Sequence, residues 1–299
     1  MNAALKRAIR LSFEQAAASY DDAAFLQLEI ARRLDERLDL MKLAPARILD
    51  AGCGTGFAFP LLNRRYPKAD LVGLDLARNM LLQARQRLPR PSLLGRVGRL
   101  FAGAASPLVC ADMASLPLAR DSIDLAWSSL ALQWLDEPEA VFKETRRVLR
   151  PGGLLLFATL GPDTLKELRA AFAGLDGHGH VNRFIDMHDL GDALVHAGFA
   201  NPVMEMEHIT LTYADLKGLL RDLKGIGAHT VLEGRREGLM GRAEWRRLVD
   251  NYERFRQDGR LPATYEVIYG HAWVGDKSNW DDGRKVIQLK IEQRQRGLR

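Results

Sequence analysis

The chain has 299 residues, of which 47% are hydrophobic, and a formal net charge of +5. This length and composition can bury a full core, and no apolar run is long enough to cross a bilayer, so we expect a soluble single-domain protein without a membrane partner. The basic excess favours an acidic partner, but no zinc-finger pattern or aromatic nucleic-acid-reading run accompanies it, and we do not expect nucleic acid to bind.

The N-terminal segment, residues 1–41, is predicted to form two helices and lacks an export signal. Apolar residues recur every four positions along the second helix, at Leu26, Ile30, Leu34 and Leu38. The first residues show no apolar region followed by a small-residue cleavage site. The two cysteines, Cys53 and Cys110, fit a reducing compartment and are too few for a metal site, so we expect a cytoplasmic protein without bound metal.

A glycine-rich turn after the first predicted strand indicates a ligand site. The apolar strand ends in Asp50 and is followed at once by Gly52, Gly54 and Gly56, which leave no side chains between the backbone and a ligand. The next strand ends in Asp75, and a carboxylate at the end of a neighbouring parallel strand can accept both hydroxyls of a ribose. The sequence therefore predicts a nucleoside site.

The spacing of these glycines distinguishes between kinds of nucleoside. A dinucleotide fingerprint reads G-x-G-x-x-G, whereas this chain reads D-x-G-x-G-x-G. Asp50 would repel a phosphate but can hold an ammonium group, so the ligand is expected to carry an amino acid. The pattern resembles the first motif of the class I S-adenosylmethionine-dependent methyltransferases. This resemblance implies S-adenosylmethionine as cofactor and an α/β fold with a seven-stranded, mostly parallel, doubly wound sheet.

The remaining chain supplies alternating strands and helices for such a sheet. Further strands are predicted at 71–74, 107–110, 122–129, 154–159, 202–212 and 264–274, with the last one antiparallel at the sheet edge. Helices are predicted at 76–88, 140–149 and 189–197. Residues 90–106 are longer than a usual connection and are interpreted as an exposed insertion.

Other expected cofactor contacts follow from where the strands end. Asp112 and Met113 follow the third strand, where an acid can take the adenine amino group, although an acid there can equally cap the next helix. Ser128 lies at the carboxyl end of the fourth strand. Tyr20, at the joint of the N-terminal helices, either touches the methionine end, as the enzyme class implies, or staples the two helices. The expected cofactor contacts are Tyr20, Asp50, Gly52, Gly54, Asp75, Leu76, Met80, Asp112, Met113 and Ser128.

Two stretches, 161–186 and 214–260, do not fit the sheet and are interpreted as a helical lid that excludes water from the site.

With these stretches included, the chain resembles the malonyl-[acyl-carrier protein] O-methyltransferase family. The segments that carry this resemblance are AASYDDAAFLQ (17–27), LDAGCGTG (49–56), SSLALQWLDEP (128–138), GPDTLKELR (161–169), HVNRFIDMHDLGDAL (180–194) and PVMEMEHITLTY (202–213). It implies methylation of the free carboxylate of malonyl-acyl carrier protein, the first step of pimeloyl synthesis for biotin. The alternative is an S-adenosylmethionine-binding hydroxylase or assembly factor, related to a complex I assembly family associated with arginine hydroxylation.

A carboxylate acceptor is ionised at neutral pH and needs a clamp rather than a general base. Lys166, Arg183 and His188 are the candidates for this clamp, because they lie in the matched segments; each can equally be a surface charge or a helix cap. The histidines lack the paired spacing of a helix-borne metal site. Because acyl carrier protein is acidic, the basic helices within 214–260 are the expected docking face.

Overall fold

The computed structural model describes residues 3–88, 108–176, 178–227 and 240–275, and is built on one seven-stranded sheet. The strand order is β3-β2-β1-β4-β5-β7-β6, with β7 antiparallel to both of its neighbours and the other pairs parallel. The strands are β1 (Arg47–Ala51), β2 (Asp70–Asp75), β3 (Leu108–Cys110), β4 (Ile123–Ser129), β5 (Leu149–Leu160), β6 (Ala200–Tyr213) and β7 (Leu261–Trp273). This confirms the predicted α/β class and the mostly parallel sheet.

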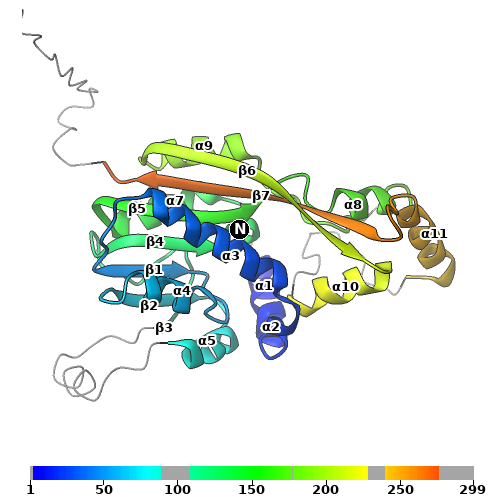
Figure 1. Cartoon of the computed structure of the whole chain (residues 1–299), viewed down its shortest axis with the longest axis horizontal. Coiled ribbons are helices and arrows are strands. Elements are labelled where there is room, and N and C mark those ends of the chain that lie inside the picture. The colour runs from blue at the N-terminus through cyan, green and yellow to red at the C-terminus, as the bar shows by residue number, and fades with distance from the viewer. Residues whose placement is uncertain (1–2, 89–107, 177, 228–239, 276–299) are drawn as a thin grey trace, which may run out of the picture.

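Helices cover both faces of the sheet (Figure 1). They are α1 (Ala3–Ala16), α2 (Tyr20–Ala23), α3 (Phe25–Arg37), α4 (Ala58–Arg65), α5 (Arg78–Ala84), α7 (Pro138–Val148), α8 (Lys166–Phe172), α9 (Met187–His196), α10 (Leu216–Gly225) and α11 (Arg242–Glu253), with the 3-10 turns η1 (Leu38–Leu40), η2 (Arg85–Arg87) and η3 (Leu132–Trp134). Within these ranges no helix has both the length and the apolar composition that a bilayer-spanning segment needs.

The two faces of the sheet carry separate apolar cores. On one face the four leucine and isoleucine positions of α3 and η1 pack with α4 against residues such as Trp127 and Leu156, and all of these side chains are buried. On the other face α7 and α9 pack against residues such as Leu49 and Phe157. Successive strand residues thus alternate between two covered faces, as a doubly wound sheet requires.

The last strand differs from its prediction in position. β7 is antiparallel as expected, but it lies between β5 and β6, so β6 is the edge strand. Burial explains the order: β7 is buried along almost its whole length, whereas β6 alternates between half-buried and exposed residues. Residues of β7 pack into the apolar cores on both faces of the sheet, so its burial does not alternate along the strand.

The N-terminal segment also differs from the prediction, because a short helix, α2, separates the two expected helices. The hydroxyl of Thr55 donates to Asp21 (2.7 Å), and Arg87 pairs with Asp21, so α2 is fixed against the glycine turn. The interpretation of 90–106 as an insertion lies outside the described residues.

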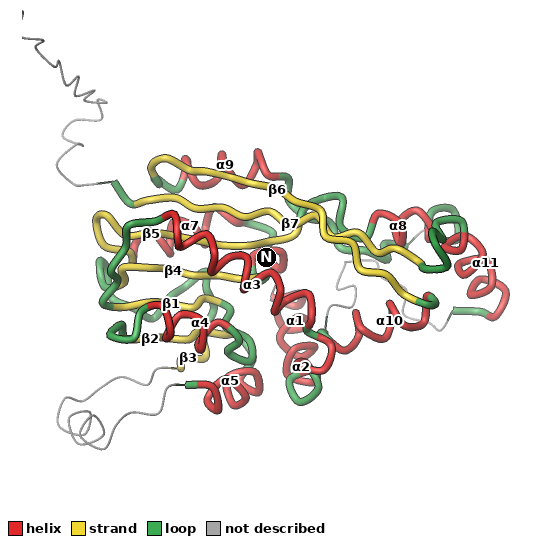
Figure 2. The backbone as a smooth tube through the Cα atoms, in the orientation of Figure 1, coloured by secondary structure: helices red, strands yellow, loops and turns green. Residues whose placement is uncertain are grey.

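β6 and β7 continue past the end of β5 as a two-stranded ribbon that leads to α8, α10 and α11 (Figure 2). These three helices belong to the stretches expected to form a lid. α10 returns to the N-terminal helices: a Cβ on Gly225 would lie 2.8 Å from that of Ala23, and the hydroxyl of Ser12 donates to the carbonyl of Gly227 (2.8 Å).

Candidate active site

The turn between β1 and α4 is held open for a ligand by its glycines. The backbone N–H groups of Gly52 and Cys53 both donate to the carbonyl of Leu74 (2.7 and 2.9 Å), which fixes the turn against β2. Gly52 has φ +79°, and a Cβ there would lie 2.3 Å from the Cβ of Ala131. Gly54 has φ +52° and faces open space. The first glycine is therefore required for packing, and the second leaves room beside the backbone.

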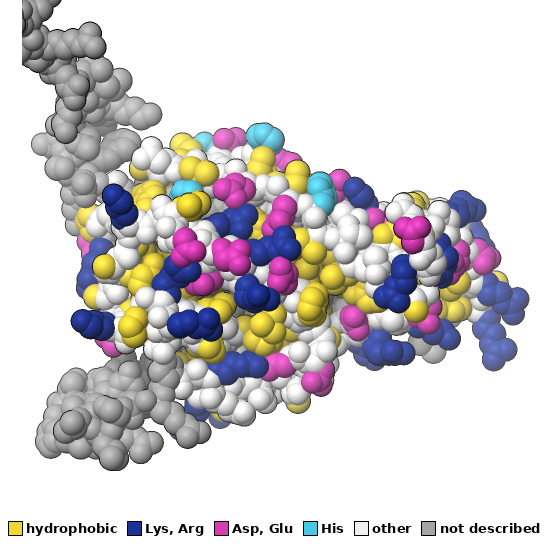
Figure 3. Space-filling model, viewed as in Figure 1, with side chains coloured by type: hydrophobic (Ala, Val, Ile, Leu, Met, Phe, Trp, Pro, Cys, Tyr) yellow, Lys and Arg dark blue, Asp and Glu magenta, His cyan; other side chains and the backbone are white. Residues whose placement is uncertain are grey.

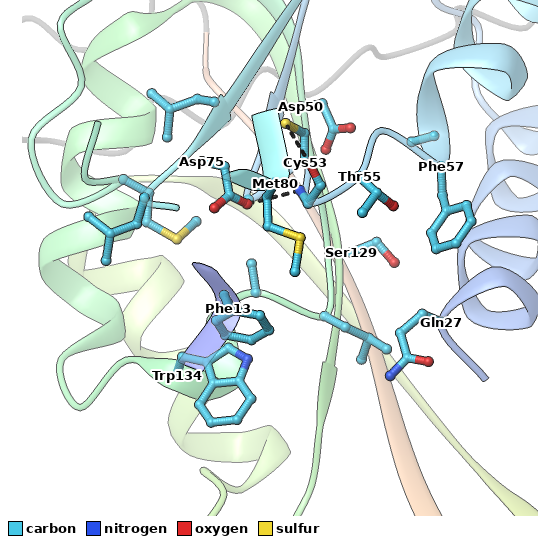
Figure 4. A pocket seen from close by; sticks show the side chains of 18 of the residues that line it. Phe13, Gln27, Asp50, Cys53, Thr55, Phe57, Asp75, Met80, Ser129 and Trp134 are labelled. Carbon is cyan, nitrogen blue, oxygen red and sulfur yellow. Dashed lines mark hydrogen bonds between the residues drawn. The ribbon is translucent and has the colours of Figure 1, made fainter. Parts of the chain in front are cut away.

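Asp75, at the end of β2, is fixed by backbone donors. Its carboxylate accepts the N–H groups of Gly54 (2.9 Å; Figure 4) and Ala77 (2.8 Å), one on each oxygen. Burial raises its pKa to about 6, while these hydrogen bonds oppose the rise. Each carboxylate oxygen has a further lone pair, so the group can still accept two hydroxyls of a ribose.

Asp50 is a buried carboxylate whose hydrogen bonding is incomplete among the described residues. It is 2% exposed, and its Oδ2 has no hydrogen-bond partner among the described residues. Burial, followed by the charge of Asp75, raises its pKa to about 8. A buried, unpaired carboxylate is unfavourable unless a cation joins it, and the ammonium of an amino acid supplies that cation. This acceptor, together with the open space beside Gly54, fits an amino-acid-bearing nucleoside.

A cavity lies along this turn (Figure 4); we call it the first cavity. The predicted contacts that line it are Tyr20, Asp50, Gly52, Gly54, Asp75, Leu76, Met80, Asp112 and Met113. Asp112 also forms an ion pair with Lys6, which brings α1 to the end of β3. Ser128 is the exception, because its side chain is buried and its hydroxyl donates to the carbonyl of Ala51 (2.8 Å). Its neighbour Ser129 lines the cavity instead, because adjacent strand residues point to opposite faces.

Several lining residues were not anticipated from the sequence. Phe13 and Trp134 meet edge to face, with ring centroids 5.3 Å apart, and close one side of the first cavity. Gln27 reaches the cavity from the first turn of α3. A four-residue spacing between Gln27 and Ala31, both of which line the cavity, is the one sequence signal that could have indicated this face of the helix.

A second cavity, of about 440 Å³, adjoins the first. Five described residues line both: Phe13, Tyr20, Gln27, Leu130 and Trp134. The second cavity extends from this shared wall to α8 and α10, where Leu168, Phe172, Leu220 and Leu223 line it. The lining is mainly apolar, and the second cavity lies next to the first one.

The three predicted clamp residues lie away from the shared wall. Lys166 is paired with Asp163 (3.3 Å), and neither lines one of the two cavities. His188 has an 84% exposed side chain next to Asp186, the N-cap of α9. Arg183 lines a third cavity, which shares Trp134 with the other two. None of the three lines the first or the second cavity.

One described cluster could hold a metal ion by composition: ligand atoms of Asp163, His208 and Glu266 lie within 4.8 Å of one another. Glu266 already accepts the backbone N–H of Asp163 (2.7 Å), and none of the three lines the first or second cavity.

Comparison with known proteins agrees with this geometry. Residues 49–157 match the family described as Methyltransferase domain. The chain is 59% identical to the malonyl-[acyl-carrier protein] O-methyltransferase of Laribacter hongkongensis, over 95% of each chain. It is 52% identical to the protein of the same name from Gallionella capsiferriformans, over 96% of this chain and 97% of that one.

Solved structures share the fold at low sequence identity. The YcgJ protein of Bacillus subtilis is 13% identical, with a TM-score of 0.54 over 82% of this chain and 99% of that chain. A putative methyltransferase of Bacillus halodurans is 17% identical, with a TM-score of 0.53 over 81% and 98%. The chain belongs to the malonyl-[acyl-carrier protein] O-methyltransferase family and is an S-adenosylmethionine-dependent methyltransferase.

Proposed function

We propose that this enzyme methylates the free carboxylate of malonyl-acyl carrier protein, the acceptor for which its relatives are named. The observation that carries the proposal is the pair of adjoining cavities, one shaped for a nucleoside and one mainly apolar. An acceptor in the second cavity reaches the first at the wall formed by Tyr20, Gln27 and Trp134. The reaction would open pimeloyl synthesis for biotin, as the family resemblance implies.

For the cofactor, we assign the ammonium group to Asp50 and the ribose hydroxyls to Asp75. Asp50 has a free buried acceptor atom, and Asp75 is held by two backbone donors that leave acceptor capacity unused. Asp112 and Met113 follow β3 beside Leu76 on the same cavity, which suits an adenine ring. Met80, also on this cavity, provides an apolar contact.

We assign α8, α10 and α11 to a lid over the acceptor. Leu168 and Phe172 of α8 and Leu220 and Leu223 of α10 face the second cavity, so these helices exclude water from it. α11 packs behind α8, where Leu248 and Tyr252 are buried in the same core. The lid residues thus form the wall of the acceptor site that lies opposite the sheet.

We propose that the carrier protein docks on the exposed basic face of α10, defined by Lys217, Arg221 and Lys224. Lys and Arg side chains gather at the end of the molecule formed by α10 and α11 (Figure 3), and these three are exposed. Such a face steers an acidic partner toward the second cavity, which Lys224 also borders.

We place the reaction in the cytoplasm, which suits the two free cysteines, Cys53 and Cys110.

The proposed reaction is tested by incubating the enzyme with methyl-labelled S-adenosylmethionine and malonyl-loaded carrier protein. Base hydrolysis of the expected methyl ester releases labelled methanol. A product that forms only with oxygen and a reductant, and without label, would instead identify a hydroxylase.

The docking face is tested by replacing Lys217, Arg221 and Lys224 together by Glu. The Michaelis constant of this variant for carrier-bound substrate should be at least tenfold higher than that of the unchanged enzyme at low salt. High salt should raise the Michaelis constant of the unchanged enzyme and so narrow this difference, because salt screens the attraction. Cofactor affinity should be unchanged, because the three residues lie outside the first cavity. The matched control replaces Arg32, an exposed residue on α3, by Glu. Equal Michaelis constants for the triple variant and the unchanged enzyme would remove this face as the docking site.

A further inference from the structure

The wall shared by the two cavities carries few polar groups. Of its five described residues, only Tyr20 and Gln27 have hydrogen-bonding side chains, since the others are Phe13, Leu130 and Trp134. No described lysine, arginine or histidine lines this shared wall. The shared wall therefore offers a carboxylate neutral donors, whereas His180 and Lys224 line the second cavity beyond it.

The amide oxygen of Gln27 is buried and has unused hydrogen-bonding capacity. Its Oε1 has no partner among the described residues, and Figure 4 shows the amide reaching from α3 toward the cavity. The neighbouring amide of Gln133 differs: its Nε2 donates to the carbonyl of Leu130 (2.7 Å), and its Oε1 accepts the hydroxyl of Thr159 (3.4 Å). A buried amide without a partner is unfavourable, which indicates that Gln27 is completed by a ligand.

The fold holds Gln27 rigidly at this place. Its neighbours Leu26 and Ile30 are buried in the core beneath α3, so the helix cannot rotate without exposing them. Turning the terminal amide by half a rotation exchanges its oxygen and nitrogen in the same volume, so it can present N–H groups to an acceptor. Tyr20 presents a second donor, because burial raises the pKa of its hydroxyl and keeps it protonated.

We propose that Gln27 binds the acceptor carboxylate through its amide N–H and aligns one carboxylate oxygen for methyl transfer. This assignment rests on the function proposed above and replaces the cationic clamp expected from the sequence.

The chemistry favours a neutral donor. When S-adenosylmethionine is bound, a lone pair on the carboxylate oxygen forms the new O–C bond while the S–C bond of the sulfonium breaks and its electron pair stays on sulfur, with no proton transferred. A lysine or arginine in contact with the carboxylate would stabilise it most before the reaction, when its charge is still complete. An amide N–H orients the carboxylate oxygen but stabilises the ionised carboxylate less before the reaction. The contribution of Gln27 is therefore to align this oxygen with the methyl group.

The test compares Gln27→Leu, Gln27→Glu and a control, Gln86→Leu, an exposed glutamine in η2. Gln27→Leu introduces an apolar side chain of similar size and removes both the oxygen and the nitrogen of the amide. We expect its kcat on malonyl-loaded carrier protein to fall about 10- to 100-fold, the range for one hydrogen bond to a charged group. Its affinity for S-adenosylhomocysteine, measured by calorimetric titration, should stay within about twofold, and the control should match the unchanged enzyme in both measurements.

Gln27→Glu provides a readout that a purely structural role would not change. An ionised glutamate repels the acceptor carboxylate, whereas a protonated one donates a hydrogen bond. Its rate relative to the unchanged enzyme should therefore be lowest near pH 8 and recover as the pH is lowered.

Each contrary result has a distinct meaning. If Gln27→Leu keeps its kcat, or loses affinity for S-adenosylhomocysteine to the same extent as activity, this assignment is overturned while the proposed function stands. If the relative rate of Gln27→Glu does not depend on pH, carboxylate binding by this residue is likewise refuted. If the unchanged enzyme does not methylate malonyl-loaded carrier protein, the proposed function fails first and the assignment with it.

Discussion

The buried carboxylate of Asp50 leads to a prediction that links binding to stability. In the cofactor-free protein its pKa is raised to about 8 by burial and by Asp75, against an ordinary value of 3.8. The folded state therefore holds a proton that the unfolded state releases between roughly pH 4 and pH 8. Folding stability then falls as pH rises through this window, because the unfolded chain binds fewer protons than the folded one.

The size of the effect follows from the pKa difference. One proton changes the free energy of unfolding by about 1.4 kcal/mol per pH unit, so about 4 kcal/mol is lost between pH 4 and pH 7 as an upper figure. Asp50→Asn removes this titration and keeps the shape of the side chain. The variant should be more stable than the unchanged protein at pH 7 to 8, by about 2–4 kcal/mol, and similar to it near pH 4. It should also bind S-adenosylhomocysteine at least about tenfold more weakly, because the ammonium loses a charged partner.

Urea unfolding of both proteins without cofactor at intervals from pH 4 to pH 8 measures this difference. The matched control is Asp192→Asn, which changes an exposed acid on α9. A stability difference that stays constant across the pH range would refute the pKa reasoning. An unchanged affinity for S-adenosylhomocysteine would refute the assignment of the ammonium group to Asp50.

Four further substitutions test separate parts of the site and its support. Gly52→Ala should destabilise the fold by about 2–4 kcal/mol in urea unfolding, because its Cβ would collide with that of Ala131 at positive φ; Gly54→Ala, whose Cβ meets only open space, should be milder in unfolding and mainly weaken binding of S-adenosylhomocysteine in calorimetry. Asp75→Ala should lower that affinity about 100-fold by removing the ribose acceptor, and an affinity equal to that of the unchanged enzyme would contradict this role. Glu167→Ala should destabilise the fold by about 1–3 kcal/mol in thermal unfolding, because this buried carboxylate accepts the backbone N–H of Thr264 (3.1 Å) and its hydroxyl.

The cofactor half of the site could be predicted from the sequence because its geometry is local. Asp50, Gly52 and Gly54 lie within five consecutive residues at the end of one strand, and Asp75 ends the neighbouring strand. Parallel pairing then brings these residues together without further information. Ser128 shows the limit of this reasoning: the sequence predicts the strand end, but whether Ser128 or Ser129 faces the cavity depends on which face the pleat presents to it.

The acceptor half could not be predicted in the same way. Lys166, Arg183 and His188 were chosen for their charge and for the segments that contain them, but their direction is set by helix ends and tertiary packing. His188 illustrates this, because its position in the first turn of α9 directs it to solvent beside the N-cap Asp186. The order of β6 and β7 differs from the prediction for a related reason. The inner position belongs to the strand that buries more apolar surface there, which is β7, and this depends on the whole sheet and not on either strand alone.

The two proposed halves of the site are built differently. The proposed cofactor contacts come from consecutive strand ends of a sheet whose core fixes them, whereas the cavity proposed for the acceptor is lined by residues of α2 and α3, of the segment after β4, and of α8 and α10. Its far wall therefore depends on contacts between distant parts of the chain, such as Gly225 against Ala23. Changes in α10 can reshape that wall without disturbing Asp50 or Asp75, so acceptor choice can vary while cofactor binding stays constant. Tyr20 and Gln27 are where the two surfaces meet, and a residue at that boundary can align the acceptor only if both cavities are intact.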